Sequence, residues 1–292
     1  MLTRRKFVHS VLASSAMIAI SPDLFSGIKN FDSRIELGAC LSIDNSELIK
    51  RFKYNYLEEI VGRFFLPAES DEKFAENLSK YKASGIKLYA VNSFLPATLK
   101  CVGPDVNTDA ILKYAETLFR RMEQTTTKIL VFGSGGSRRI PDGYDKALAI
   151  GQFIDINRKL GPLAQKYKVT IVLEPLNYSE TNLLNTVEEG IDLTGKVNHT
   201  NIGLLADLYH MLKNGETAGS IVKAGKLLKH THIAEKDERT APGIAGDDFR
   251  PFFAALKNIQ YQGKLSIECR WKDLEAELPL GMKTIRDQME SV

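Results

Sequence analysis

Short apolar runs alternate with helix-like stretches eight times between about residue 34 and the C-terminus, and this alternation constrains the fold more than any other feature of the 292-residue chain. The apolar runs are rich in Val, Ile and Leu, which is typical of parallel strands that are covered on both faces. Eight strand–helix units of this spacing match the number and length of a (β/α)8 barrel. No linker, internal repeat or low-complexity segment divides them. The sequence therefore predicts an α/β protein with one TIM-barrel domain.

Turn and cap residues set the limits of these elements. Pro175 cannot donate a sheet hydrogen bond, so the fifth strand should end at Glu174. Gly85 is expected to end one helix, and Asn107 is expected to cap the next. The expected strands are residues 35–41, 56–60, 87–91, 128–132, 169–174, 202–207, 230–233 and 264–268. The expected helices are residues 46–52, 71–84, 107–124, 144–167, 186–195, 216–228, 248–259 and 274 onward.

Residues 1–27 are expected to lie outside the barrel, which would occupy residues 28–292. Arg4 and Arg5 precede an apolar stretch, residues 11–20, that is too short to span a bilayer. This arrangement resembles a twin-arginine export signal, which implies a periplasmic protein with no stable membrane insertion after cleavage. The alternative is a basic amphipathic N-terminus of a cytosolic protein.

The formal charge and the cysteines exclude two classes of protein. The net charge is +3, and removal of residues 1–27 deletes three basic residues and one acidic residue, which leaves +1. A near-neutral domain lacks the basic surface of a nucleic-acid binder. Cys40, Cys101 and Cys269 have no CxxC spacing, so we expect buried, unpaired side chains rather than a disulfide framework.

Four of the later strands end in, or contain near their ends, a residue that can bind a metal ion. Because active sites of α/β barrels lie at the C-terminal ends of the strands, these side chains should converge on one face. Three carboxylates and one imidazole form an oxygen-rich site that suits Mn²⁺ or Mg²⁺ and is also compatible with Co²⁺ or Zn²⁺. The sequence predicts one divalent ion there, and the four ligands are Glu174, Asp207, His232 and Glu268, separated by 33, 25 and 36 residues.

Each of these residues also has an ordinary structural interpretation. The carboxylate after the fifth strand could accept backbone N–H bonds, Asp207 could cap the next turn, and His232 could be a hydrogen-bonded core histidine. Glu268 could pair with Arg270 or Lys272. Four such coincidences at successive strands are harder to accept than one shared site.

The glycine run at residues 133–136 follows the fourth expected strand. It lacks the Lys-Ser/Thr pair that contacts phosphate and metal in phosphate-binding loops. We therefore expect a tight turn there that lets the backbone approach a substrate.

The segments around these residues resemble the xylose-isomerase-like barrel superfamily, and within it the sugar isomerase/epimerase branch. That branch includes tagatose/psicose 3-epimerases, hydroxypyruvate isomerases and inosose dehydratases. The resemblance covers the whole chain after the signal and is most specific in its C-terminal half. It implies that the same four residues bind a single divalent metal ion. It is carried by residues 173–177, 205–211, 230–232 and 265–268, with further similarity at 243–249 and 261–263.

The resemblance also implies residues that bind the substrate. In the ketose epimerases a glutamate six residues after the first ligand and a histidine three residues after the aspartate hold substrate hydroxyls. Glu180 and His210 occupy these positions here, although His210 could instead orient Glu174. The family's arginine, six residues after the metal histidine, falls on Glu238, and Arg239 comes one place later. Arg239 is therefore the expected substrate-binding arginine, and the departure leaves the identity of the sugar open.

These residues favour proton transfer next to a carbonyl group. Such a reaction needs a Lewis acid for the enediolate oxygen and a carboxylate close to the carbon atom. Glu174 and Glu268, expected on opposite sides of the metal, could serve the two faces of one substrate carbon. We therefore predict a metal-dependent sugar isomerase or epimerase in which both glutamates are catalytic and a small carbohydrate is the substrate.

Three other functions are alternatives to this one. A dehydratase or lyase that acts on a keto-cyclitol or keto-glycoside would use the same metal and the same enolisation. A non-catalytic sugar-binding barrel is less compatible with an intact ligand set. Phosphodiester cleavage, as in apurinic endonucleases of this fold, needs histidines on the early strands, and strands one to four supply none. The sequence is compatible with a homo-oligomer as well as with a monomer.

Overall fold

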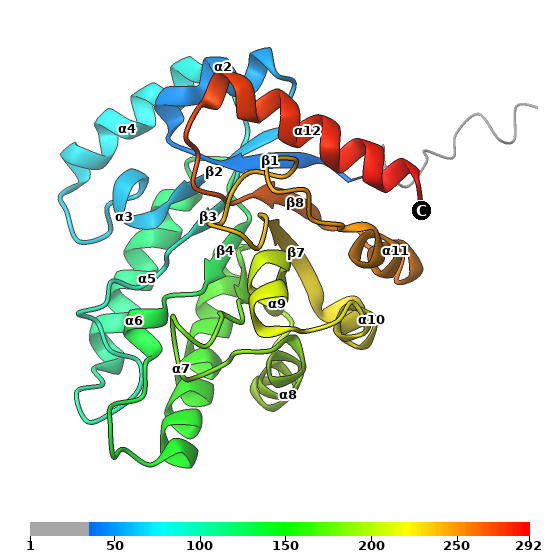
Figure 1. Ribbon diagram of the computed structural model, residues 1–292. Helices are drawn as coiled ribbons and strands as arrows, with labels where there is room; N and C mark the ends of the chain where they lie inside the picture. The colour runs from blue at the N-terminus through cyan, green and yellow to red at the C-terminus, as the bar shows by residue number, and fades with distance from the viewer. Residues whose placement is uncertain (1–34) are drawn as a thin grey trace, which may run out of the picture.

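Eight parallel strands close into a barrel in the computed structural model, which describes residues 35–292. Each strand pairs with the next along the chain, and the last pairs with the first (Figure 1). This confirms the predicted barrel, whereas the predicted export signal lies outside the described residues. The strands are β1 (Leu37–Cys40), β2 (Tyr56–Ile60), β3 (Leu88–Asn92), β4 (Ile129–Phe132), β5 (Thr170–Leu173), β6 (Ile202–Asp207), β7 (Leu228–Ile233) and β8 (Lys264–Ile267).

Helices surround the ring of strands (Figure 1). Asn107 caps its helix as predicted by accepting the N–H of Ala110, and Thr186 caps another by accepting the N–H of Glu189. The α-helices are α2 (Ser46–Arg51), α3 (Val61–Phe64), α4 (Asp71–Ser84), α5 (Thr108–Met122), α6 (Gly135–Arg138), α7 (Lys146–Lys166), α8 (Val187–Val197), α9 (Leu208–Asn214), α10 (Gly219–Ala224), α11 (Arg250–Asn258) and α12 (Leu274–Glu290). Short 3-10 turns lie at η2 (Ile43–Asn45) and η3 (Gly225–Leu227).

The segment after β6 differs from the prediction. A single helix over residues 216–228 was expected, but the chain forms α9 directly after the strand and then the shorter α10 and η3. Asp207 starts α9 because its side chain accepts the backbone N–H of Tyr209 at 2.8 Å. Gly215, at φ 71°, ends the helix in the left-handed conformation that glycine adopts without strain.

The interior of the barrel is apolar on one side and polar on the other. Strands β7, β8 and β2 contribute His230, Ser266, Glu58 and Tyr56, all fully buried. Gly38 on β1 leaves room for this set, because a Cβ there would collide with the ring of Tyr56. The opposite side, from β3 to β6, holds a separate apolar cluster of Ala90, Ile129, Val131, Val172 and Leu205.

The three cysteines are unpaired, as predicted. Cys101 is buried, but Cys40 and Cys269 are partly exposed and line a cavity at the C-terminal ends of the strands. The prediction of burial is therefore right for Cys101 alone. Among residues 35–292, no helix is both long and apolar enough to cross a membrane.

Candidate functional site

The structure brings the four predicted metal ligands together. Glu174 directly follows β5, Asp207 ends β6, His232 lies near the end of β7, and Glu268 directly follows β8. One potential ligand atom from each residue lies within 4.8 Å of those of the other three. Glu174, Asp207 and His232 are buried, and the side chain of Glu268 is 24% exposed. The cluster therefore lies at the C-terminal end of the barrel, with one side accessible to a substrate.

His232 presents one ring nitrogen to the cluster and uses the other as an anchor. Its Nδ1 lies 3.2 Å from Glu174 Oε1 and 3.1 Å from Glu268 Oε2. Its Nε2 lies 2.9 Å from Glu58 Oε1, beneath the cluster. Although burial disfavours the charged ring, Glu58 and Glu268 together raise the pKa of His232 well above its usual value. Nδ1 is therefore the nitrogen available to a metal ion.

Glu58 belongs to the candidate site, and the sequence interpretation missed it. Its carboxylate is fully buried and also lies 2.9 Å from His230 Nε2 and 2.7 Å from the hydroxyl of Ser266, which hydrogen-bonds Tyr56. Despite burial, His232 and His230 hold the pKa of Glu58 below its usual value. The sequence signal that could have revealed it is the pair of consecutive glutamates within the second strand. Because side chains alternate along a strand, one of the two must point into the barrel.

Asp207 is both a helix cap and a member of the candidate metal cluster. One oxygen, Oδ1, caps α9. The other, Oδ2, lies 3.4 Å from Arg239 Nη2 and 3.5 Å from His210 Nε2. A cap uses only one carboxylate oxygen, so the second remains available to a ligand.

Glu174 lies in a recess that the glycine run provides. A Cβ at position 133 would collide with its carboxylate, so a larger residue after β4 would displace Glu174 from this position. The buried guanidinium of Arg138 donates to the carbonyl oxygens of Glu174 at 2.7 Å and Phe132 at 3.0 Å. The predicted turn at residues 133–136 is thus partly helical, and its first glycine accommodates this carboxylate. Burial raises the pKa of Glu174.

Glu268 pairs with neither Arg270 nor Lys272, so this structural alternative is wrong. Asn92 donates to its Oε1 at 3.1 Å, and Arg239 donates to its Oε2. Arg239 and His232 outweigh the effect of burial and lower the pKa of Glu268 to about 2. Glu268 is thus held as a carboxylate by groups on both of its oxygens.

Arg239 reaches the site because two successive residues adopt the left-handed conformation. Glu238 and Arg239 have φ values of 50° and 57°. Glu238 points outward and pairs with Lys272 at 2.9 Å, while Arg239 turns inward and lies over the ring of Tyr209. The offset of one residue in the sequence is therefore absorbed by the backbone.

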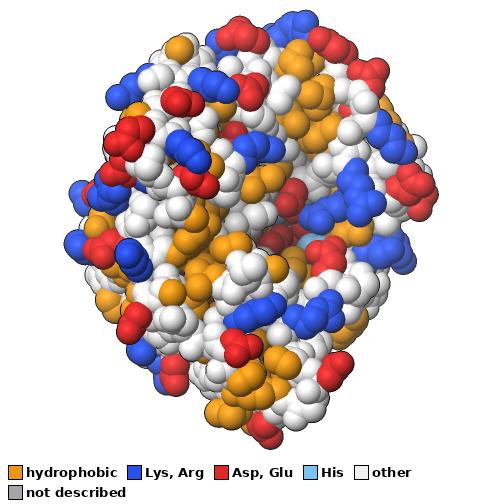
Figure 2. All heavy atoms as spheres, turned by 90° about the vertical axis from the view of Figure 1, so that its left-hand side faces the viewer, with side chains coloured by type: hydrophobic (Ala, Val, Ile, Leu, Met, Phe, Trp, Pro, Cys, Tyr) orange, Lys and Arg blue, Asp and Glu red, His pale blue; other side chains and the backbone are white. Residues whose placement is uncertain are grey.

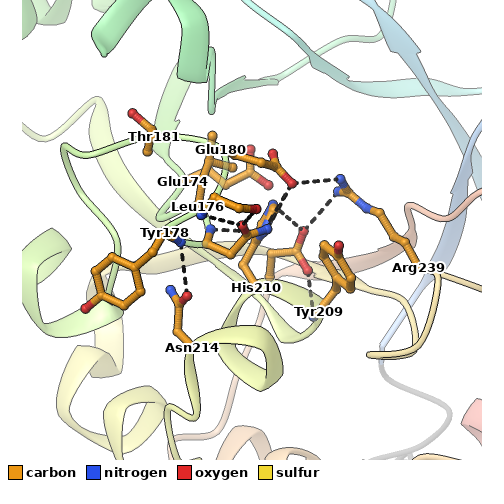
Figure 3. A network of polar contacts seen from close by, with 12 residues as sticks. Glu174, Leu176, Tyr178, Glu180, Thr181, Tyr209, His210, Asn214 and Arg239 are labelled. Carbon is orange, nitrogen blue, oxygen red and sulfur yellow. Dashed lines mark hydrogen bonds and ion pairs between the residues drawn. The ribbon is translucent and has the colours of Figure 1, made fainter. Parts of the chain in front are cut away.

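The carboxylate of Glu180 lies between His210 and Arg239 (Figure 3), with its Oε1 4.0 Å from His210 Nδ1 and 3.9 Å from Arg239 Nη1. The backbone N–H of Asn177 donates to His210 Nδ1 at 3.2 Å, so in the neutral ring the proton is on Nε2. His210 Nε2 is buried and has no hydrogen-bond partner among the described residues. The ring therefore presents an N–H donor.

All three predicted substrate-binding residues line one cavity of about 280 Å³, together with Glu174 and Glu268. Figure 2 shows carboxylate and histidine atoms at the bottom of a hollow in the surface, with basic side chains on its rim. The catalytic and substrate-binding candidates thus face a shared space.

The donor set fits a divalent cation. Glu174 Oε1 is buried and accepts no hydrogen bond from the described residues, even though His232 Nδ1 is close. Such an atom is costly unless a further partner is present. Three carboxylates cluster with His232, and Arg239 pairs with only two of them, so a cation at the cluster would reduce the repulsion among the three.

Comparisons with known proteins identify relatives in sequence and in fold. Over 112 residues, 38% of the chain, the sequence is 38% identical to L-ribulose 3-epimerase of Methylomonas sp. strain DH-1. The match spans only 39% of that relative. Two crystal structures share the fold. D-allulose 3-epimerase from Methylomonas sp., in complex with D-allulose, aligns at a TM-score of 0.73, with 22% identity, over 87% of this chain and 97% of the other. The IOLI protein, solved with a zinc atom, aligns at 0.68 with 20% identity, over 88% and 97%.

The family described as the xylose isomerase-like TIM barrel matches residues 47–289, which is most of the barrel. The match includes every residue of the cluster and of the cavity that it faces. The chain belongs to the xylose isomerase-like TIM-barrel family.

Proposed function

We propose that the protein is a metal-dependent sugar isomerase or epimerase that transfers a proton at a carbon next to a carbonyl group. The observation that supports this most directly is the placement of two carboxylates, Glu174 and Glu268, 3.2 Å and 3.1 Å from His232 Nδ1 at the edge of a cavity. The similarity to proteins named as 3-epimerases of L-ribulose and D-allulose also supports a reaction of this kind.

Glu174, Asp207, His232 and Glu268 would hold one divalent ion, for which Mn²⁺ or Mg²⁺ is favoured by the oxygen-rich set and Zn²⁺ by the zinc found in a protein of the same fold. When bound, the ion would stabilise negative charge on the substrate oxygen atoms next to the reacting carbon. The protein's own residues supply the other parts of the reaction.

Glu174 and Glu268 act as the acid–base pair in this proposal. They come from β5 and β8, so one can remove a proton from one face of a substrate carbon while the other returns a proton to the opposite face. Their order of action depends on the configuration of the sugar.

Arg239, Glu180 and His210 position the sugar. The protonated Nε2 of His210 suits a hydroxyl oxygen, and Glu180 suits a hydroxyl hydrogen. A dehydratase or lyase on a keto-cyclitol or keto-glycoside begins with the same proton removal, and it is the second candidate because a further cavity adjoins the first.

Incubation of the metal-loaded protein with ketoses in deuterated water tests the proposal. We expect incorporation of deuterium at the carbon next to the carbonyl, measured by NMR, and its loss after removal of the metal with a chelator. Absence of exchange across a panel of ketoses and keto-glycosides would leave a binding protein as the better explanation.

A change at Glu58 tests the support beneath the metal ligands. Glu58→Gln keeps the shape but replaces one acceptor by a donor, so one of the two histidines loses its anchor. We expect metal affinity to fall by roughly 10- to 100-fold, as for other residues that orient a ligand. Glu59→Gln is the matched control, since Glu59 lies on the same strand but contacts Arg63 and the N–H of Ile43. Equal metal affinities in the two variants, measured by titration calorimetry, would contradict the role of Glu58.

We also propose export to the periplasm, on the basis of the paired arginines at positions 4 and 5. Arg4→Lys together with Arg5→Lys should keep the precursor in the cytoplasm, because the pair is what the export receptor recognises. Immunoblots of cell fractions measure the outcome, and an undiminished periplasmic yield would refute a twin-arginine signal.

A further inference from the structure

A second cavity of about 400 Å³ adjoins the one above the metal ligands. Asn92, Ser93, Arg239 and Glu268 line both cavities. These four residues form a boundary that both spaces share, so a ligand in one cavity would lie next to a ligand in the other. The second cavity extends from there over the ends of β1, β2 and β8.

The volumes suit a ligand with two parts. The cavity above the metal ligands, at about 280 Å³, is near the lower limit of roughly 300 Å³ for small-molecule sites. It suits a single sugar ring. The adjoining cavity is larger, so a free monosaccharide bound for reaction would leave most of the accessible space unfilled.

The lining of the second cavity suits a sugar ring. Trp271, Leu41 and Ile60 supply apolar surface for the C–H face of a ring, and Ser42 and Asn45 supply neutral hydrogen-bonding groups for hydroxyls. The ring of Trp271 is partly exposed, so part of its surface can contact a ligand in this cavity.

The charges of the second cavity do not favour an anionic group. Arg63 pairs with Glu59 at 2.7 Å, and Arg239 pairs with Glu268 and Asp207. Arg270 lies at the exposed rim. Most of the positive charge is therefore already neutralised, which argues against a site for a sugar phosphate.

We propose that this second cavity binds a second sugar ring, so that the substrate is a keto-sugar joined to another sugar rather than a free ketose. The inference rests on the proposed function only for the position of the reacting ring. It extends that function by naming the class of substrate: disaccharides or glycosides that contain an enolisable ketone.

Trp271 provides a readout that does not depend on catalysis, because it is the only tryptophan in the chain. Titrations of the metal-loaded protein, monitored by tryptophan fluorescence, should compare D-fructose and D-fructose 6-phosphate with disaccharides in which glucose is joined to O4, O5 or O6 of fructose. Glucosides oxidised to a ring ketone complete the panel. We expect at least one two-ring ligand to change the fluorescence at a concentration roughly tenfold below that needed for D-fructose.

Variants test whether the same cavity determines specificity. Trp271→Ala and, at the exposed end of β2, Ile60→Ser should each raise the KM for the two-ring substrate by roughly tenfold and leave exchange on D-fructose within about twofold. Leu148→Ser, a change of an exposed apolar residue that lines neither cavity, is the control. Both variants of the cavity lie outside the set of residues proposed for catalysis.

The outcomes separate the two proposals. A fluorescence response that prefers two-ring ligands supports the second subsite even if no proton exchange occurs, in which case only the proposed reaction is wrong. Equal responses to D-fructose and every two-ring ligand would overturn the subsite even if exchange is rapid. A response that is strongest with D-fructose 6-phosphate would also overturn it, since the cavity would then recognise an anion.

Discussion

Glu174→Gln and Glu268→Gln should each lower turnover by roughly 10²- to 10⁴-fold, the usual contribution of a positioned general base. Glutamine preserves the shape of the side chain and one oxygen for the metal ion but cannot accept the substrate proton. The expected result is therefore a large loss of kcat with a smaller change in metal content. Steady-state kinetics and elemental analysis of the same preparations measure the two effects.

The surroundings of the two glutamates predict different secondary effects. Glu268 accepts from Asn92 and Arg239, so glutamine there places an amide group opposite donors and should also disturb Arg239. Glu174 is held mainly through its backbone, by Arg138, and glutamine should leave that contact intact. Glu174→Gln is accordingly the cleaner test of base chemistry. For an epimerase, one of the variants should still exchange deuterium at one face of the carbon without completing inversion.

Near wild-type turnover in both variants would show that another group is the base. His210 is the next residue to consider, but its Nδ1 is occupied by the N–H of Asn177 and its Nε2 carries the proton in the neutral ring. The structure thus makes His210 a hydrogen-bond donor to the substrate. His210→Gln, which retains a donor, should weaken binding of the sugar more than it lowers turnover.

The parts of the fold that sequence predicted are those set by local signals. Strand β6 matches its predicted limits because an apolar run ends at a carboxylate, and α4 matches because its apolar period ends at Gly85. The clustering of the four predicted ligands follows from strand ends, since parallel strands in a barrel bring these ends together. Both the periodic pattern of apolar residues and the residues that end an element can be recognised in a single sequence.

The parts that sequence missed depend on contacts between distant segments. Glu58 contacts His232 only because the folded barrel brings β2 and β7 close together. The two residues are 174 positions apart in the sequence. Arg138 is buried because it joins the end of β4 to the segment after β5. Arg239 points inward because two successive residues adopt the left-handed conformation. Neither of them is glycine, so the residue types give no sign of this conformation in the sequence.

Asp207→Asn and Asp207→Ala should separate the two roles of this aspartate. Asparagine is an N-cap as good as aspartate, so Asp207→Asn should keep α9 and the stability of the barrel while removing the charge that faces the cluster. Asp207→Ala should lose the cap as well, at a cost of about 1 kcal/mol in the free energy of unfolding. Both variants should lose most of the bound metal and the activity that depends on it.

His232→Ala should also remove metal, but its effect on stability must be measured separately. The substitution leaves the buried carboxylate of Glu58 with His230 and Ser266 as its remaining partners, and a buried charge that loses its partner typically costs about 3–5 kcal/mol. Combining His232→Ala with Glu58→Gln should recover part of that loss because the uncompensated charge is gone, while metal binding stays absent. Metal content by elemental analysis and unfolding in urea give the two readouts. Full metal occupancy in Asp207→Asn and in the double variant would refute the assignment of both ligands, whatever the stability of either protein.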